Sequence, residues 1–101
     1  MWTLNDIVRL LNKHHQRATY GAVAGVLGVS ARGIMNGRTP CDQDSWIVAK
    51  TTSRKTGSRR GWPTGYTDAQ IHSECLRQIH RNPAGFIDDE DDLEQWLNAH
   101  S

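Results

Sequence analysis

The stretch from Thr19 to Gly37 is the feature that most constrains the fold of this 101-residue chain. Thr19 is a favourable helix N-cap, and Gly28 stands where a helix that begins there should end in a left-handed residue. Ser30 can cap a third short helix over residues 31–36, which Gly37 closes. The apolar positions of this unit are Tyr20, Val23, Ala24, Leu27, Val29 and Ile34. These offsets predict a helix-turn-helix over residues 19–37.

The second helix of such a unit enters the major groove of DNA, which is wide enough for one helix. Arginine and asparagine side chains can bond base edges there, and serine can reach a base or a phosphate. The predicted outward residues are Ser30, Arg32, Gly33, Met35 and Asn36, with Arg38 just beyond the helix. The alternative is an ordinary helical hairpin with a glycine turn, which is common in small α-rich domains.

A basic loop follows this unit. Residues 45–52 are rich in β-formers, residues 53–61 are rich in Ser, Gly, Arg and Lys, and residues 62–66 can return as a second strand. The cations of the loop are Lys50, Arg54, Lys55, Arg59 and Arg60. A hairpin with a basic tip after a helix-turn-helix predicts a winged helix whose loop lies along phosphates. Standing alone, the loop would instead indicate a solvated surface segment.

Further amphipathic segments complete a single domain over residues 1–101, with the wing at 45–66 and C-terminal helices within 67–100. Thr3 to His15 reads as a helix with a near capping box, and Thr67 with Gln70 opens a helix that reaches about Arg81. A short edge strand is predicted at residues 86–87. A last helix starts at Asp88 or Asp89 and buries Leu93, Trp96 and Leu97. The predicted fold class is mainly α with a small β-hairpin, a winged helix-turn-helix.

Composition suits a soluble, cytoplasmic globular domain. Hydrophobic residues make up 37% of the chain, charged residues 23%, and the mean hydropathy is −0.65. Apolar runs are far shorter than the roughly 18 residues that a membrane span needs, so we expect no membrane partner. Cys41 and Cys75 do not form a disulfide framework, and we expect both to be reduced.

Charge is distributed unevenly along the chain. All 12 Lys and Arg residues lie between Arg9 and Arg81, and together with the five acidic residues of positions 1–81 they leave a formal charge of +7. The last twenty residues carry six acids and no Lys or Arg. A basic body with an acidic tail fits anion binding on one face, or a bipolar surface that serves solubility. We expect the last helix to lie away from the DNA face.

Metal, cofactor and catalytic signatures are weak. His72, Cys75 and His80 share one predicted helix, but the paired spacing of a zinc site is missing. Cys75 at a core position is better interpreted as a small hydrophobic residue. The acids from Asp88 onward favour a helix N-terminus rather than a calcium loop. We therefore expect no metal, no cofactor and no enzymatic activity.

With these elements in order, the chain resembles the winged-helix half of the alkylguanine-DNA alkyltransferases and, more closely, the alkyltransferase-like proteins. The residues that carry the resemblance are Thr19-Tyr20-Gly21, Val23-Ala24, Leu27-Gly28, Arg32, Trp46, Val48, Thr64-Gly65-Tyr66 and Leu76. It implies that Tyr20 helps to rotate a target nucleotide, that Arg32 fills the gap in the base stack, and that Trp46 stands near the alkyl-acceptor position. Extruding a base costs a few kcal/mol, which such contacts offset.

The alkyl-acceptor motif of that family, Pro-Cys-His-Arg-Val, is absent. Cys41 follows Pro40 but precedes Asp42-Gln43-Asp44, and acids beside a thiol oppose thiolate formation. Ser45 and Ile47 flank Trp46 where the family has Pro and His, and Arg32 comes about two residues early. The resemblance therefore favours a DNA-repair sensor of alkylated bases over an alkyltransferase.

The leading hypothesis is a non-enzymatic protein that binds double-stranded DNA, as an alkylated-base sensor or as a sequence-specific transcriptional regulator. The main alternative is a protein-protein interaction module on the same fold, which would use the acidic tail and exposed tryptophans. An alkyltransferase with Cys41 as nucleophile is a third. The sequence leaves the DNA target and the oligomeric state open.

Overall fold

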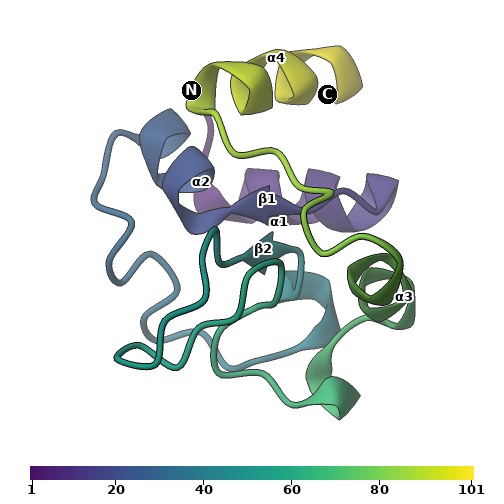
Figure 1. Cartoon of the computed structure of the whole chain (residues 1–101). Coiled ribbons are helices and arrows are strands. Elements are labelled where there is room, and N and C mark those ends of the chain that lie inside the picture. Colours follow the sequence, from purple (N-terminus) through teal and green to yellow (C-terminus); the bar gives the residue numbers. More distant parts are fainter.

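The computed structural model describes residues 1–101 and arranges four α-helices around a small parallel sheet (Figure 1). The helices are α1 (Leu4–His14), α2 (Tyr20–Leu27), α3 (Ser73–Arg81) and α4 (Glu90–His100). The strands are β1 (Ala18–Thr19) and β2 (Ile47–Val48), and the 3-10 helices are η1 (Asp42–Asp44) and η2 (Asp68–Gln70). A mainly helical chain with a small β element is therefore confirmed.

Side-chain caps set the ends of the first two helices where the sequence predicts them. The Thr3 hydroxyl accepts from the Asp6 backbone N–H at 3.1 Å, and the Asp6 carboxylate accepts from the Thr3 N–H. The Thr19 hydroxyl accepts from the N–H of Ala22 at 3.1 Å. Gly28 ends α2 with a φ of 71°, a left-handed conformation that glycine adopts without steric cost. These short-range hydrogen bonds and the left-handed glycine fix where α1 and α2 begin and where α2 ends.

The sheet joins segments that are distant in sequence. Ala18 pairs with Ile47 and Thr19 with Val48, in parallel. On the other side of β1, Ala18 forms an isolated bridge with Ile87, to which the edge strand predicted at residues 86–87 is reduced. This pairing holds the start of α2 against the segment that leads into the basic loop.

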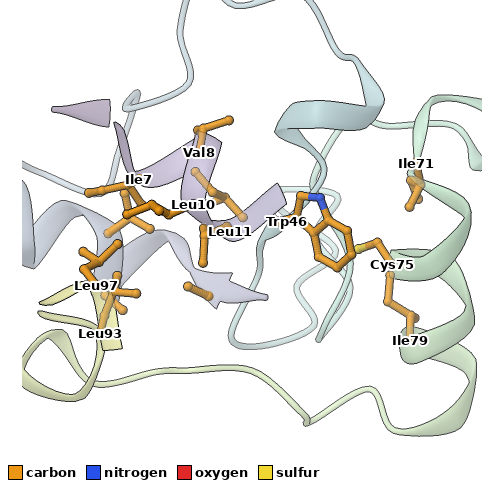
Figure 2. Packing of buried hydrophobic residues seen from close by; sticks show 14 residues of the cluster. Ile7, Val8, Leu10, Leu11, Trp46, Ile71, Cys75, Ile79, Leu93 and Leu97 are labelled. Carbon is orange, nitrogen blue, oxygen red and sulfur yellow. The ribbon is translucent and has the colours of Figure 1, made fainter. Parts of the chain in front are cut away.

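The core is a single cluster of 14 buried residues that extends along α1 (Figure 2). Leu93 and Leu97 of α4 are fully buried near α1, as the sequence predicts, whereas Trp96, the third residue of that prediction, is only partly buried. At the other end, Trp46 lies between α1 and Cys75 of α3. Burying each large apolar side chain contributes about 1.5–3 kcal/mol, so these contacts hold α3 and α4 to the rest of the chain.

The helix predicted over residues 31–36 does not form, and the prediction is wrong for this element. The segment is a series of turns in which Gly33 and Gly37 adopt φ values of 83° and 81°. A left-handed residue at Gly33 interrupts α-helical geometry in the middle of the segment. The N–H groups of Asn36 and Arg38 instead donate to carbonyls three residues earlier. Residues 30–38 therefore take the place of the expected recognition helix, and we call them the turn segment.

The basic loop (residues 50–60) closes without regular strands. The strand predicted over residues 45–52 is limited to β2, and its partner is β1 rather than residues 62–66, which form no strand. Bridges of Ala49 with Arg60 and of Ser53 with Ser58 join the two arms. Pro63 has no N–H to continue a ladder, which explains why the returning arm stops there.

The helix predicted from Thr67 to Arg81 is split into η2 and α3. The capping box of Thr67 and Gln70 is present, but it closes only a 3-10 turn. Ile71 is extended, and the His72 ring then starts α3 by accepting the Glu74 backbone N–H on Nδ1. Asp89, one of the two predicted caps of the last helix, accepts from Asp91 at the start of α4.

Candidate nucleic-acid interface

A pocket of about 470 Å³ opens between the turn segment and the basic loop. Residues 31–36 form one side of it. The lining residues outside that segment are Tyr20, Ala49, Thr51, Thr56, Ser58 and Thr64. In Figure 1 the two segments lie on the same side of the molecule, away from α3. The structure thus joins the residues predicted to contact bases with the loop predicted to contact phosphates.

Tyr20 is held in place at this pocket. It is the first residue of α2, directly after the Thr19 cap, and its ring is partly buried. Its hydroxyl oxygen accepts the backbone N–H of Thr64 at 2.9 Å. Because that bond uses the oxygen as acceptor, the hydroxyl proton is free to donate to a ligand.

The turn segment presents most of its predicted contact residues to solvent. Ser30, Arg32 and Asn36 are exposed, and Met35 is partly buried. The Ser30 hydroxyl accepts the Arg32 backbone N–H at 3.2 Å, while the Arg32 guanidinium takes part in none of the four ion pairs. Arg32 is therefore free to meet a phosphate or a base.

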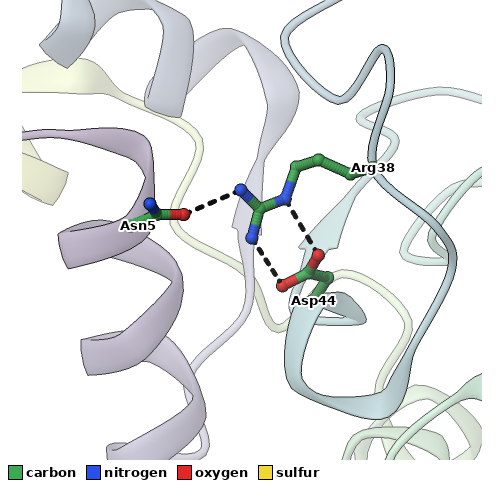
Figure 3. Close-up of polar contacts among 3 residues, drawn as sticks. All are labelled: Asn5, Arg38 and Asp44. Carbon is green, nitrogen blue, oxygen red and sulfur yellow. Dashed lines mark hydrogen bonds and ion pairs between the residues drawn. The ribbon is translucent and has the colours of Figure 1, made fainter.

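Arg38 has a different role from the contact that the sequence predicts (Figure 3). Its guanidinium donates to both carboxylate oxygens of Asp44, at 2.9 and 3.1 Å, and to the Asn5 side-chain oxygen at 2.8 Å. The hydrogen bonds with Asp44, whose side chain is only 7% exposed, raise the pKa of Arg38. Arg38 therefore anchors the end of the turn segment to α1 and η1 instead of projecting a free charge.

The five cations of the basic loop are all exposed, but they are not equivalent. The Arg59 guanidinium lies 4.0 Å from the centroid of the Trp62 ring, a cation–π contact. Lys50 pairs with Asp88 at 3.2 Å. Arg54, Lys55 and Arg60 take part in none of the four ion pairs. These three are the loop charges most available to a phosphate.

Trp46 does not belong to this surface. Its side chain is 0% exposed, its Nε1 donates to Asn12 at 2.8 Å, and its ring stacks on His15 with centroids 5.3 Å apart. The ring therefore has no surface available for a nucleotide, and the predicted DNA contact at Trp46 is replaced by a structural role.

Sequence reasoning missed the hydroxyl groups of the pocket. Thr56 and Ser58 share a hydrogen bond of 2.8 Å, and the Ser58 hydroxyl donates to the Thr51 carbonyl at 3.1 Å. Groups of Ser and Thr alternate with cations along the loop, which is the sequence pattern that could indicate a polar lining. The sequence does not show that residues 31–36 pack beside the loop, so it does not predict a pocket there.

The two cysteines occupy contrasting environments, and neither lines the pocket. Cys41 is exposed, whereas Cys75 is buried. Burial raises the pKa of the Cys75 thiol to about 11, above its ordinary value of 9. No group of three or more His, Cys, Asp or Glu side chains is arranged to hold a metal ion.

The raised pKa of Cys75 predicts that the protein becomes less stable at alkaline pH. The native thiol keeps its proton until about pH 11, whereas the unfolded one loses it near pH 9. The contribution of the buried, protonated thiol to the free energy of unfolding is therefore complete below pH 9. It is lost as the pH rises from 9 to 11. Urea unfolding across this range should show a fall in stability that is smaller in Cys75→Ala, after allowance for the lower starting stability of that variant.

Thiol titration provides the control. A disulfide reagent at neutral pH should modify Cys41 quickly and Cys75 only after denaturation. Cys41→Ser should leave the alkaline unfolding profile unchanged. Two rapidly reacting thiols in the native protein would contradict the burial of Cys75.

None of the helices is both long enough and apolar enough to cross a membrane. Searches against protein-family models, curated proteins and solved structures find no match to this chain.

Proposed function

We propose that this chain is a non-enzymatic protein that binds double-stranded DNA and receives one extrahelical base in the pocket between the turn segment and the basic loop. The observation that carries the proposal is the pocket itself, because Tyr20, Arg32, Met35 and Asn36 line it together with Thr51, Thr56 and Ser58 of the basic loop. On this proposal the fold is a variant winged helix, with the turn segment in place of the recognition helix and the basic loop as the wing.

The dimensions and chemistry of the pocket suit a base. Its volume of about 470 Å³ lies within the roughly 300–1,000 Å³ of small-molecule sites. Tyr20, Ile34 and Met35 offer apolar surface on which a flat ring can pack, and the hydroxyls around them offer hydrogen bonds. A damaged base is easier to extrude than an intact one, since it costs less unstacking and unpairing energy. This supports an alkylated-base sensor, the class that the sequence resembles.

Two observations favour binding without alkyl transfer. The pocket contains no cysteine, so no thiol stands where the alkyl group of a bound base would lie. Burial raises the pKa of Cys75, which opposes formation of the nucleophilic thiolate. Mass spectrometry after incubation with alkylated DNA should accordingly show no adduct on the protein.

The decisive experiment compares a plain duplex with the same duplex carrying a single alkylguanine, by fluorescence anisotropy at 50 and 200 mM salt. We expect tighter binding to the lesion and loss of that preference in Arg32→Ala. Equal binding to both duplexes together with a preferred sequence would support a transcriptional regulator instead. Failure to bind any duplex at about 50 mM salt would overturn the proposal and favour a protein-interaction module.

Neutralising the tip of the basic loop should weaken binding to both duplexes. Each cation that neutralises a phosphate contributes about 0.9 to the slope of log affinity against log salt. The double variant Arg54→Gln/Lys55→Gln should therefore reduce that slope by about 1.8 and leave the lesion preference unchanged.

The control is Arg77→Gln/Arg81→Gln on α3, which removes the same charge away from the pocket and also breaks the exposed Arg77–Glu74 ion pair. It should alter the slope much less. Equal effects of the two double variants would mean that net charge, rather than the loop, governs affinity.

A further inference from the structure

A second hollow lies beside the first arm of the basic loop, and its lining differs from that of the base pocket. It measures about 330 Å³ and is lined by Lys50, Thr51, Thr52, Arg60, Phe86 and Asp88. Ala49 lines only the base pocket, while Lys50 and Thr52 line only the second hollow. Alternate residues of an extended arm point to opposite sides. The arm therefore lies between the base pocket and the second hollow, called the cationic hollow below, and Thr51 lines both.

Asp88 occupies the cationic hollow in the free protein. One carboxylate oxygen lies 3.2 Å from the Lys50 ammonium, and the other accepts the Thr19 hydroxyl at 3.2 Å. Thr19 also caps α2, so the carboxylate is held by a fixed part of the fold. None of the other five acids of the C-terminal twenty residues forms an ion pair. Asp88 is thus specifically placed to neutralise this part of the loop.

We propose that Lys50 and Arg60 form a subsite for one phosphate group of the DNA backbone, and that Asp88 competes with that phosphate for Lys50. The inference rests on the proposed DNA-binding function and names the anion contact on which Asp88 acts. A phosphate diester carries the same charge as the carboxylate and can also reach the guanidinium of Arg60, which has no ion-pair partner.

The exposure of the pair allows this exchange. The side chains of Lys50 and Asp88 are 66% and 40% exposed. Ion pairs at such positions are weak and screened by salt, so an incoming phosphate can replace the carboxylate. The displaced carboxylate stays near the phosphate because Thr19 holds it, and the like charges repel. Asp88 therefore lowers affinity for any anion in this hollow.

The test compares Asp88→Asn with Asp91→Asn in duplex binding. Both variants remove one negative charge from the same acidic segment, but only Asp88 contacts a cation. Asparagine retains an oxygen that can accept the Thr19 hydroxyl, so α2 should stay capped. We expect Asp88→Asn to tighten binding to plain duplex about three- to fivefold at 50 mM salt, more than Asp91→Asn does, with the difference shrinking at 200 mM.

A double variant isolates the subsite. Lys50→Gln in the Asp88→Asn background should cancel the gain, because the phosphate then lacks the ammonium that Asp88 had occupied. Thermal unfolding of each variant verifies that the fold is intact. Equal gains in Asp88→Asn and Asp91→Asn, or a gain that survives Lys50→Gln, would overturn the subsite while leaving DNA binding in place.

Inorganic phosphate serves as a DNA-independent probe. Its titration should shift the amide resonances of Thr52 and Arg60, and at lower phosphate concentrations in Asp88→Asn than in the wild type. Shifts without any duplex binding would overturn the DNA function and leave the subsite. Duplex binding without such shifts in either protein would overturn the subsite and leave the DNA-binding function in place.

Discussion

Replacing Trp46 by alanine should lower the free energy of unfolding by about 3–5 kcal/mol. The indole is 0% exposed and is the largest fully buried side chain of the core. It lies between α1 and Cys75 of α3 (Figure 2) and stacks on the His15 ring. Its removal leaves a cavity where these elements meet. The protein therefore loses the transfer free energy of the indole and also bears the energetic cost of the cavity. Urea denaturation followed by circular dichroism measures the effect.

Trp46→Phe is the matched variant. It retains a ring in the core but removes the Nε1 hydrogen bond to Asn12, which would leave the partly buried Asn12 oxygen without this donor. The expected cost is about 1–3 kcal/mol. Because the ring is inaccessible, duplex affinity of the folded variant should equal that of the wild type. A large loss of affinity in a stably folded Trp46→Phe protein would restore the direct DNA contact that the sequence predicted.

Arg17→Met should destabilise the protein by about 3 kcal/mol, since it leaves three carbonyl groups without their donor. The Arg17 side chain is 1% exposed, and its guanidinium donates to Gly61, Pro83 and Asn82 at 3.1, 3.0 and 2.6 Å. No carboxylate pairs with it, and burial lowers its pKa. Removing the buried charge relieves its desolvation cost and offsets part of the destabilisation. The three carbonyl groups left without a hydrogen-bond donor contribute more, so the net effect is destabilising.

Arg17→Met should also loosen the end of the basic loop. Gly61 follows the loop directly, and a Cβ there would overlap the Pro83 carbonyl oxygen, so the two backbones are in close contact. Without Arg17, amide hydrogen exchange at Ala49 and Gly61 should accelerate beyond the global change. Arg54→Gln, at the exposed tip, should change stability by less than about 0.5 kcal/mol. Comparable losses in the two variants would show that the contacts of Arg17 contribute little.

The candidate site was only partly predictable. Tyr20, which follows a threonine cap, and Arg32, whose backbone N–H binds Ser30, both line the pocket, although the sequence predicts DNA contacts at these residues and no pocket. Short-range patterns misjudged residues 31–36, because the apolar spacing favours a helix while Gly33 takes a left-handed turn. The sequence predicts a free Arg38, but its guanidinium binds Asp44, six positions along the chain, and Asn5, 33 positions away.

The ends of α1 and α2, the buried face of α4 and the cationic character of the loop were determined by the sequence alone. Caps, glycines and helical periodicity act between residues a few positions apart, and an isolated chain already contains that information. Tertiary structure decided the burial of Trp46, the contact of Tyr20 with Thr64 and the pairing of Lys50 with Asp88. Each depends on the pairing of β1 with β2 and Ile87, which brings distant segments together and for which no local pattern exists.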